Sequence, residues 1–167
     1  IFNMLWVTDP WSTLDHSQDT TLRLMHEAII MGIPTYWSAS DQLLLSQKKG
    51  FVLAAKLKNG DTLNLSKIKL EPIPLSSFRQ IHNRIDPPVD EAYCKLIDDL
   101  IDLGATHAQI LNPPHLIKNQ SEKIPPPDLS HYSPRMLVIK HEEEIEPLQK
   151  LFSHDKEIVS KPLHLAQ

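Results

Sequence analysis

Three short loops carry residues that could bind a ligand, and each loop follows a run of residues typical of a strand. Asp9 follows the first run, an Arg-Ile-Asp-Pro-Pro segment at 84–88 follows the second, and an Asn-Pro-Pro segment at 112–114 follows the third. Asp, Asn and Pro are common in turns, so a plain turn is one interpretation of all three loops. A turn does not need a guanidinium, however. Arg84 is suited to binding a carboxylate through two parallel hydrogen bonds, with Asp86 placed to orient it.

Two lysines could bind phosphate. Lys123 and Lys161 each stand where a segment enters or ends a predicted strand, and each is followed by a proline within two residues. A lysine ammonium is a compact positive charge that suits phosphate oxygens. The alternative interpretation is that both are ordinary solvated surface charges.

Other motifs with a defined chemistry do not occur in the sequence. The four glycines lie at least ten residues apart, which excludes a Gly-rich dinucleotide fingerprint and a P-loop. His26-Glu27 is not followed by a second histidine at the spacing of a zinc protease, and there is no GxSxG sequence. The single cysteine, Cys94, lies in a predicted amphipathic helix, where a buried structural thiol is expected. We therefore assign no catalytic and no metal-binding residue from the sequence.

Composition and charge argue against a nucleic-acid-binding protein and against a membrane-spanning protein. Of 167 residues, 41% are hydrophobic and 23% are charged, which is ordinary for a globular protein of one domain plus a fragment of a second. The net charge is −4 and no basic tract extends beyond Lys48-Lys49, so we expect no nucleic-acid partner. No apolar run approaches the roughly 20 residues of a membrane span, and the N-terminus lacks the pattern of a signal peptide. We expect a cytoplasmic protein without a membrane partner.

Two strand–helix–strand units must position the three loops. Residues 2–8 and 33–38 read as strands around a helix over 20–31, with Asp19 as its N-cap and Gly32 just past its end. Residues 78–83 and 106–111 read as strands around a helix that Asp90 caps. Such units predict an α/β fold, with a mostly parallel, Rossmann-like sheet and helices on both faces. Ligands bind outside the carboxyl ends of such strands, where all three loops would lie.

The remaining segments predict an excursion and a second, incomplete domain. Asn59-Gly60 separates two strand-like runs, so we expect an antiparallel hairpin over 51–70, followed by a loop at Pro72 and Pro74. After a proline-rich stretch, residues 135–140 and 157–161 read as strands around a short helix at 142–152. One helix and two strands cannot bury their own core. We therefore expect a first domain over 1–120 and the start of a second over 121–167.

In order along the chain, these features resemble the N-terminal half of bacterial glutathione synthetases, which are ATP-grasp ligases. The resemblance covers nearly the whole chain. Its most specific element is Arg-x-Asp-Pro-Pro at 84–88, and it also includes Asp9-Pro10, Ser121-Glu122-Lys123 and Lys161-Pro162-Leu163. It implies a pre-ATP-grasp substrate domain over 1–120 and the beginning of an ATP-grasp lobe over 121–167.

The resemblance also implies an activity. Such enzymes join γ-glutamylcysteine to glycine by transferring the γ-phosphate of ATP to the cysteinyl carboxylate, and the glycine amine attacks the acyl phosphate. Lys123 and Lys161 resemble the two lysines that contact ATP phosphates, Arg84 resembles a residue near the substrate, and Asp9 and Asp86 would shape that edge. Family members often form symmetric oligomers, so a homo-oligomer is implied as well.

The end of the chain departs from the family pattern. Relatives continue after Lys-Pro-Leu into an Asp-containing, Gly-rich loop, whereas this chain reads His164-Leu165-Ala166-Gln167. The Mg²⁺ ligands are expected beyond Gln167, and the 167 residues alone are expected to be inactive. Two alternatives stay open: another ATP-grasp ligase of a carboxylate and an amine, or a non-catalytic α/β binding module without the ATP lobe.

Overall fold

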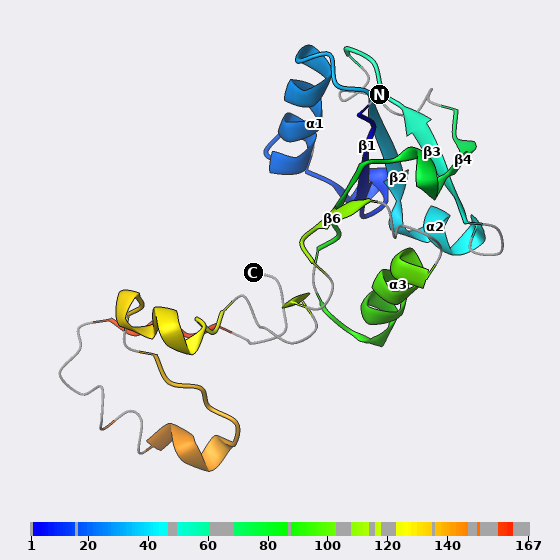
Figure 1. The fold of residues 1–167 in the computed structure, drawn as a ribbon. Coiled ribbons are helices and arrows are strands. Elements are labelled where there is room, and N and C mark those ends of the chain that lie inside the picture. The colour runs from blue at the N-terminus through cyan, green and yellow to red at the C-terminus, as the bar shows by residue number, and fades with distance from the viewer. Residues whose placement is uncertain are drawn as a thin grey trace. The chain divides into compact units, whose positions relative to one another are not determined.

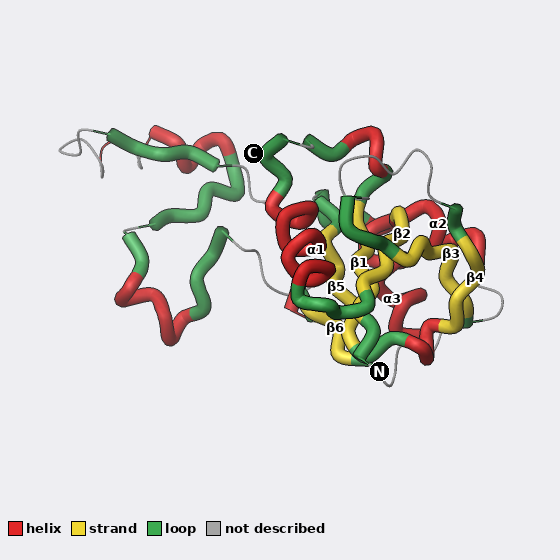
Figure 2. Tube along the Cα trace, turned by 90° about the horizontal axis from the view of Figure 1, so that it is seen from above, coloured by secondary structure: helices red, strands yellow, loops and turns green. Residues whose placement is uncertain are grey.

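The structure is a computed structural model. It describes residues 2–15, 17–46, 50–60, 69–86, 88–102, 108–113, 116–117, 123–134, 136–146, 150 and 157–161. The chain divides into two units, Ile1–Asn119 and Gln120–Gln167. In the first unit, helices cover both faces of one six-stranded sheet, as Figures 1 and 2 show from two directions.

The sheet is mixed but mostly parallel, which confirms the predicted fold class. Its strands are β1 (Met4–Thr8), β2 (Thr35–Ala39), β3 (Phe51–Lys56), β4 (Glu71–Pro74), β5 (Gln80–Arg84) and β6 (Gln109–Leu111). They lie in the order β4-β3-β2-β1-β5-β6. The strands β2, β1, β5 and β6 are parallel to one another, and β3 runs antiparallel to both β2 and β4.

Three helices accompany the sheet: α1 (Thr20–Ile30), α2 (Ser40–Ser46) and α3 (Glu91–Asp102). The connection from β1 through α1 leads to one side of β1, whereas the connection from β5 through α3 leads to the opposite side. Connections between parallel strands are right-handed. Two such connections that lead in opposite directions along a sheet therefore place their helices on opposite faces. Accordingly, α1 covers one face, and α2 and α3 cover the other (Figure 1).

Each face has its own apolar core. On the α2 and α3 side, the buried residues are Leu5, Val7, Leu43, Val52, Ala54, Leu75, Phe78, Ile81, Leu96 and Leu100. On the α1 side, they are Trp6, Leu22, Met25, Trp37, Ala39, Ala55 and Leu57. Neighbouring strand residues such as Leu5 and Trp6 fall in different cores because successive side chains of a strand point to opposite faces. The sheet therefore holds both layers in place.

Helix α1 begins at the predicted residue, Thr20, and ends at Ile30, one residue before the predicted end. The Asp19 side chain accepts hydrogen bonds from the N–H groups of Thr21 and Leu22 at 2.7 and 3.0 Å. At the other end, Gly32 has φ +75°, and the N–H groups of Gly32 and Ile33 donate back to carbonyls of the last turn. This left-handed position favours glycine because it has no Cβ. Local capping chemistry therefore fixes both ends of the helix.

The predicted loop at Pro72 and Pro74 is wrong, because both prolines lie in the edge strand β4. Next in the chain, the Leu75 N–H donates to the Gly50 carbonyl at 2.9 Å. Because N–H groups of alternate strand residues point the same way, Pro72 and Pro74 occupy positions whose N–H would face away from β3. A proline costs no ladder hydrogen bond there, so the edge strand tolerates both.

The predicted hairpin over 51–70 is described only in its first half. Strand β3 is present, and Gly60 has φ +91°, as expected of a residue in a tight turn. Residues 61–68 lie outside the described part of the chain, so the hairpin's second strand stays a prediction. The described neighbours of β3 are β2 and β4.

In the second unit, the described residues form short 3₁₀ turns at Pro127–Tyr132 and Glu142–Glu144. The strands predicted over 135–140 and 157–161 are wrong for their described residues, which have no strand conformation. Their apolar side chains are exposed, Val138 by 37% and Val159 by 79%. A strand is stable only beside another strand, and neither segment pairs with one in the described part. Of the predicted helix over 142–152, residues 147–149 and 151–152 lie outside the described residues.

The Asp19 cap makes a prediction about stability. Replacing Asp19 by Ala leaves the N–H groups of Thr21 and Leu22 without their acceptor, so we expect the free energy of unfolding to fall by about 1 kcal/mol. Urea denaturation followed by circular dichroism measures this change. Asp19→Asn is the matched control, because its side-chain oxygen can still accept both bonds. An Ala variant as stable as the Asn variant would contradict the capping role.

His82 lies against Trp6 in the middle of the sheet. The two residues face each other on β5 and β1, and their rings stack with centroids 3.8 Å apart and planes 16° apart. The Nε2 atom of His82 is buried and has no hydrogen-bond partner in the described part of the protein. Burial, together with the nearby positive charge of Arg84, lowers the pKa of His82 to about 4. The folded protein therefore favours the neutral ring.

This lowered pKa predicts a loss of stability in acid. The unfolded chain binds a proton at His82 near pH 6.5, whereas the folded chain does so only near pH 4. Stability from the neutral ring is thus complete above pH 6.5 and is lost as the pH falls towards 4. The ring is only half-buried, so we expect solvent screening to limit the loss to about 1–2 kcal/mol. Denaturation midpoints of wild type and His82→Gln between pH 7 and 4 should diverge, and parallel curves would refute the effect.

Candidate functional site

The candidate site lies at the carboxyl ends of β1 and β5. Thr8, the last residue of β1, pairs with Arg84, the last residue of β5. The chain leaves β1 towards one side of the sheet and leaves β5 towards the other, so a crevice opens between the two strand ends. In open α/β sheets, ligands bind at this kind of switch point. Asp9 follows β1 directly, and Asp86 lies two residues beyond β5.

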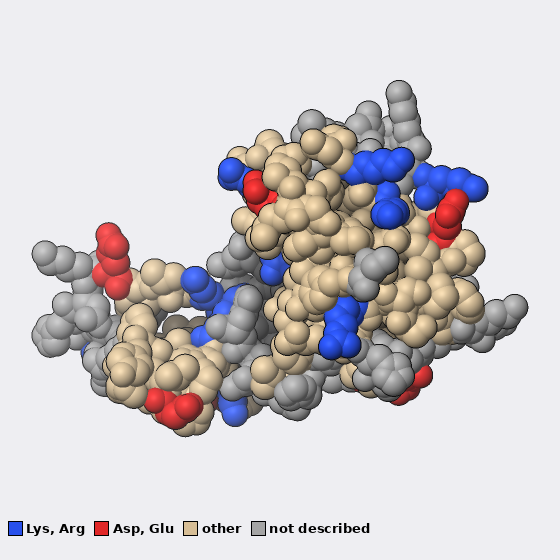
Figure 3. Space-filling view, turned by 45° about the horizontal axis from the view of Figure 1, so that its top comes forward, with Lys and Arg blue, Asp and Glu red and all other residues tan. Residues whose placement is uncertain are grey.

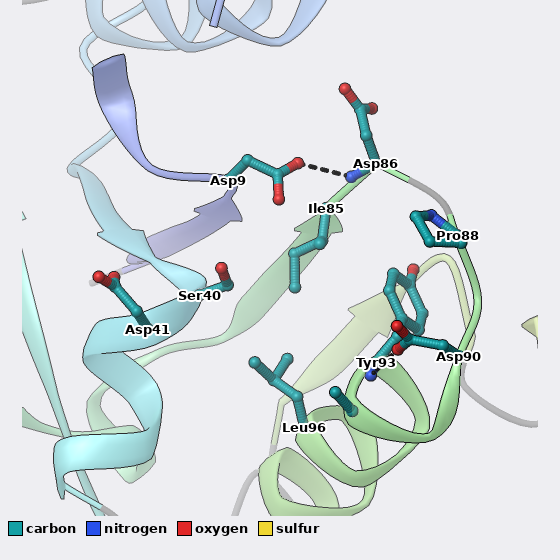
Figure 4. Close-up of a pocket in the computed structure, with 10 residues that line it drawn as sticks. Asp9, Ser40, Asp41, Ile85, Asp86, Pro88, Asp90, Tyr93 and Leu96 are labelled. Carbon is teal, nitrogen blue, oxygen red and sulfur yellow. Dashed lines mark hydrogen bonds between the residues drawn. The ribbon is translucent and has the colours of Figure 1, made fainter. Parts of the chain in front are cut away.

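A hydrogen bond ties the two loops together. The backbone N–H of Asp86 donates to Oδ2 of Asp9 at 2.8 Å (Figure 4). The structure therefore brings together two residues that lie 77 positions apart and that the sequence placed at one edge. Partial burial, followed by the charges of Asp9 and Asp19, raises the pKa of the Asp86 carboxyl, and Arg84 partly opposes this rise. Negative charge at this edge thus exceeds what Arg84 balances.

A cavity of about 280 Å³ opens beside this hydrogen bond, between the first turns of α2 and α3 (Figure 4). Its lining combines acidic, hydroxyl and apolar side chains: Asp9, Asp41, Asp86 and Asp90; Ser40 and Tyr93; and Ile85, Pro88, Ala92 and Leu96. The cavity thus offers hydrogen-bond acceptors beside an apolar wall. It is large enough for part of a small polar ligand.

Two asparagines support the wall of the cavity at α3. Asn83 on β5 donates from Nδ2 to the hydroxyl of Tyr93 at 3.1 Å. Asn112 donates from its own Nδ2 to the backbone carbonyl of Asn83 at 2.8 Å, and its φ of +63° is one that asparagine adopts more readily than most residues. Asp90 accepts from the Tyr93 N–H at 2.8 Å and caps α3 as predicted. These bonds connect the three loops of the sequence analysis at one edge of the sheet.

Arg84 lies at the same edge but on the other face of the sheet. Its Nε donates to the Thr21 hydroxyl at 3.1 Å, and its terminal nitrogen donates to the Thr20 hydroxyl at 3.5 Å. Within the described part of the chain, these hydroxyls take the guanidinium's hydrogen bonds. The expectation that Asp86 would orient Arg84 is therefore corrected: threonines in the first turn of α1 do so. Alternation along β5 turns the Arg84 side chain towards α1. Asp86 lies beyond the end of β5, in a loop that its N–H ties to Asp9.

The two predicted phosphate-binding lysines belong to the second unit. Lys123 is half-buried in a turn, and Lys161 is exposed in a segment without helix or strand. Their role stays a prediction. On the face of the molecule drawn in Figure 3, Lys and Arg side chains are dispersed among uncharged residues.

Sequence reasoning missed the part of the cavity that α2 and Tyr93 contribute. Ser40 and Asp41 open α2 directly after β2, a parallel strand whose carboxyl end lies at the same edge. The rule that singled out Asp9 could therefore have found them. No signal in the sequence shows that the Tyr93 hydroxyl meets Asn83, because this contact joins α3 to β5.

Two further findings concern metal-binding groups and membrane-spanning helices among all the described residues. In the part of the chain that the structure describes, no three His, Cys, Asp or Glu side chains form a group that could hold a metal ion. Among the same residues, no helix is both long and apolar enough to cross a membrane.

Comparison with known proteins points to one family. Residues 2–118 match the model of the prokaryotic glutathione synthetase N-terminal domain. Glutathione synthetases of Ralstonia nicotianae and Nitrosomonas europaea are 26% and 27% identical over 163 and 166 residues, and each alignment covers 96% of this chain. That of Agrobacterium fabrum is 26% identical and covers 98% of it.

The chain spans about half the length of the curated relatives it matches, between 49% and 51% for these three. The family model covers most of the chain, including the whole six-stranded sheet and the loops around the cavity. The chain therefore belongs to the family of prokaryotic glutathione synthetase N-terminal domains.

Proposed function

We propose that the complete protein is an ATP-dependent ligase that joins γ-glutamylcysteine to glycine through an acyl phosphate, and that this domain holds the dipeptide. The observation that carries the proposal is the family match over residues 2–118, which includes the Arg-x-Asp-Pro-Pro loop at the switch point of the sheet. Relatives that match nearly the whole chain bear the name glutathione synthetase.

The surroundings of Arg84 support a carboxylate-binding role. Its guanidinium is held against the first turn of α1 by the Thr20 and Thr21 hydroxyls. The Asp19 carboxylate already occupies the N–H groups at the start of α1, so the guanidinium itself is the group that would attract a substrate anion. Arginine can also grip a carboxylate with two parallel hydrogen bonds. We assign to Arg84 the binding of a substrate carboxylate, and to Asp9 and Asp86 the shaping of the neighbouring loops.

Lys123 and Lys161 would act on the nucleotide. A carboxylate and a triphosphate repel each other, so cations must neutralise both while the phosphoryl group moves. The two lysines supply such point charges in the second unit. ATP, when bound, supplies the phosphoryl group that activates the carboxylate.

The activity is tested with the complete polypeptide that the gene encodes. We expect γ-glutamylcysteine and glycine together to trigger ADP formation and to yield glutathione, measured by a coupled assay and by mass spectrometry. A panel of other dipeptides and amino acids tests the substrate. ADP formation with a different carboxylate and amine would replace the proposed substrates, and no ADP formation with any pair would refute the ligase.

The Arg84 assignment predicts a selective defect. Replacing Arg84 by Ala removes a charge-assisted contact worth about 1.5–3 kcal/mol, so we expect kcat/KM for γ-glutamylcysteine to fall at least tenfold. The KM for ATP should stay unchanged. Arg79→Ala is the matched control. Arg79 is exposed just before β5, so it lies at the amino end of the strand, whereas the candidate site lies at the carboxyl end. Unchanged kinetics in the Arg84 variant would rule out its role.

A further inference from the structure

The cavity beside Asp9 has an excess of negative charge. Four of its lining residues are aspartates, and none of the described residues that line it is a lysine or an arginine. Some of this charge has a structural use, since Asp90 caps α3 and Oδ2 of Asp9 accepts the Asp86 N–H. The other carboxylate oxygen of Asp9 points towards Ser40 and Ile85 (Figure 4). It is an acceptor that faces the cavity.

A second acceptor is buried behind the cavity wall. Asn83 is 1% exposed, and its Oδ1 is without a hydrogen-bond partner in the described part of the protein. Because strand side chains alternate, Asn83 points to the same face as Ile85, which lines the cavity. The other end of its side-chain amide donates to the Tyr93 hydroxyl, which also lines the cavity. Buried polar atoms are normally paired, so this oxygen keeps unused capacity to accept a hydrogen bond on the cavity side of the sheet.

A primary ammonium group matches this arrangement. It carries one positive charge and three N–H donors, and it bears no acceptor that the carboxylates would repel. The apolar side chains of Ile85 and Leu96 lie beside the acceptors, where they can pack against methylene groups. We propose that this cavity binds the α-ammonium end of an amino-acid substrate, with Asp9 as its counter-charge and with Asn83 and Tyr93 behind it.

This proposal rests on the proposed function and names the part of the dipeptide that the cavity takes. The γ-glutamyl residue ends in a carbon that carries both an ammonium and a carboxylate. The cavity offers a counter-charge only to the ammonium, because Asp9 lines it whereas Arg84 lies on the other face of the sheet, against α1. The cavity would therefore favour a substrate whose end carries an ammonium group over the same substrate without it.

Methyl NMR on the complete polypeptide that the gene encodes tests the proposal directly. The reporter is the Ile85 δ1 methyl signal, assigned with an Ile85→Val variant, and the titrants are γ-glutamylcysteine and N-glutarylcysteine, which lacks only the amino group. We expect γ-glutamylcysteine to shift the signal with a Kd at least tenfold lower than that of N-glutarylcysteine. Equal Kd values, or no shift with γ-glutamylcysteine, would overturn the proposal.

Two further titrants distinguish other sources of positive charge. Glycine carries an ammonium group without the γ-glutamyl chain, and MgCl₂ supplies a divalent cation. We expect both to shift the Ile85 signal at least tenfold more weakly than γ-glutamylcysteine. A comparable response to either one would assign the cavity to that ligand instead and overturn the proposal.

Replacing Asp9 by Asn tests the counter-charge without removing the link between the loops, because an Asn oxygen can still accept the Asp86 N–H. We expect the Kd for γ-glutamylcysteine to rise at least tenfold and the Kd for N-glutarylcysteine to change less than twofold. Asp102→Asn, which removes the same charge from the exposed last residue of α3, should change neither. Equal losses for both titrants would reduce Asp9 to a structural role and overturn the proposal.

The outcome is independent of the ligase assay. An ammonium-dependent shift without ADP formation by the complete protein would support the cavity and refute the ligase. ADP formation from γ-glutamylcysteine and glycine, with equal Kd values for the two dipeptides, would support the ligase and refute the cavity.

Discussion

The hydrogen bond from the Asp86 N–H to Asp9 connects the loops that follow the two central parallel strands. It forms because β1 and β5 pair in a register that ends both strands at the same level, with Thr8 beside Arg84. A shift of one residue would turn the side chains of β5 to the opposite faces and separate these two loops. The cavity and the position of Arg84 both follow from this one alignment.

Alternation along β5 then distributes the chemistry over both faces of the sheet. Asn83 points towards α3 and the cavity, whereas Arg84 points towards the first turn of α1. An arginine at a helix N-terminus and an acidic cavity therefore lie at one edge without neutralising each other completely. Partial burial raises the pKa of Asp86, and the charges of Asp9 and Asp19 raise it further against the opposing charge of Arg84.

The wrong predictions share a cause, which is that strand formation depends on neighbours. Pro72 and Pro74 are typical of a loop, yet they lie in a strand because β4 is at the edge and their missing N–H groups would face away from β3. The apolar segments over 135–140 and 157–161 are typical of strands, yet their described residues pair with nothing in the described part and stay exposed. Local composition measures the tendency to form a strand, but the partner decides the result.

The sequence by itself determined the α/β class, the two strand–helix–strand units and the ends of α1, because periodicity, the Asp19 cap and the positive φ at Gly32 depend on nearby residues. It also placed Asp9, Asp86 and Asn112 after strands, and thus at one edge of the sheet. Only the tertiary structure decided which of these residues meet. The contacts of Asp9 with Asp86 and of Asn83 with Tyr93, and the turn of Arg84 towards α1, depend on strand register and order. Long-range pairing sets that register, and no local spacing in the sequence records it.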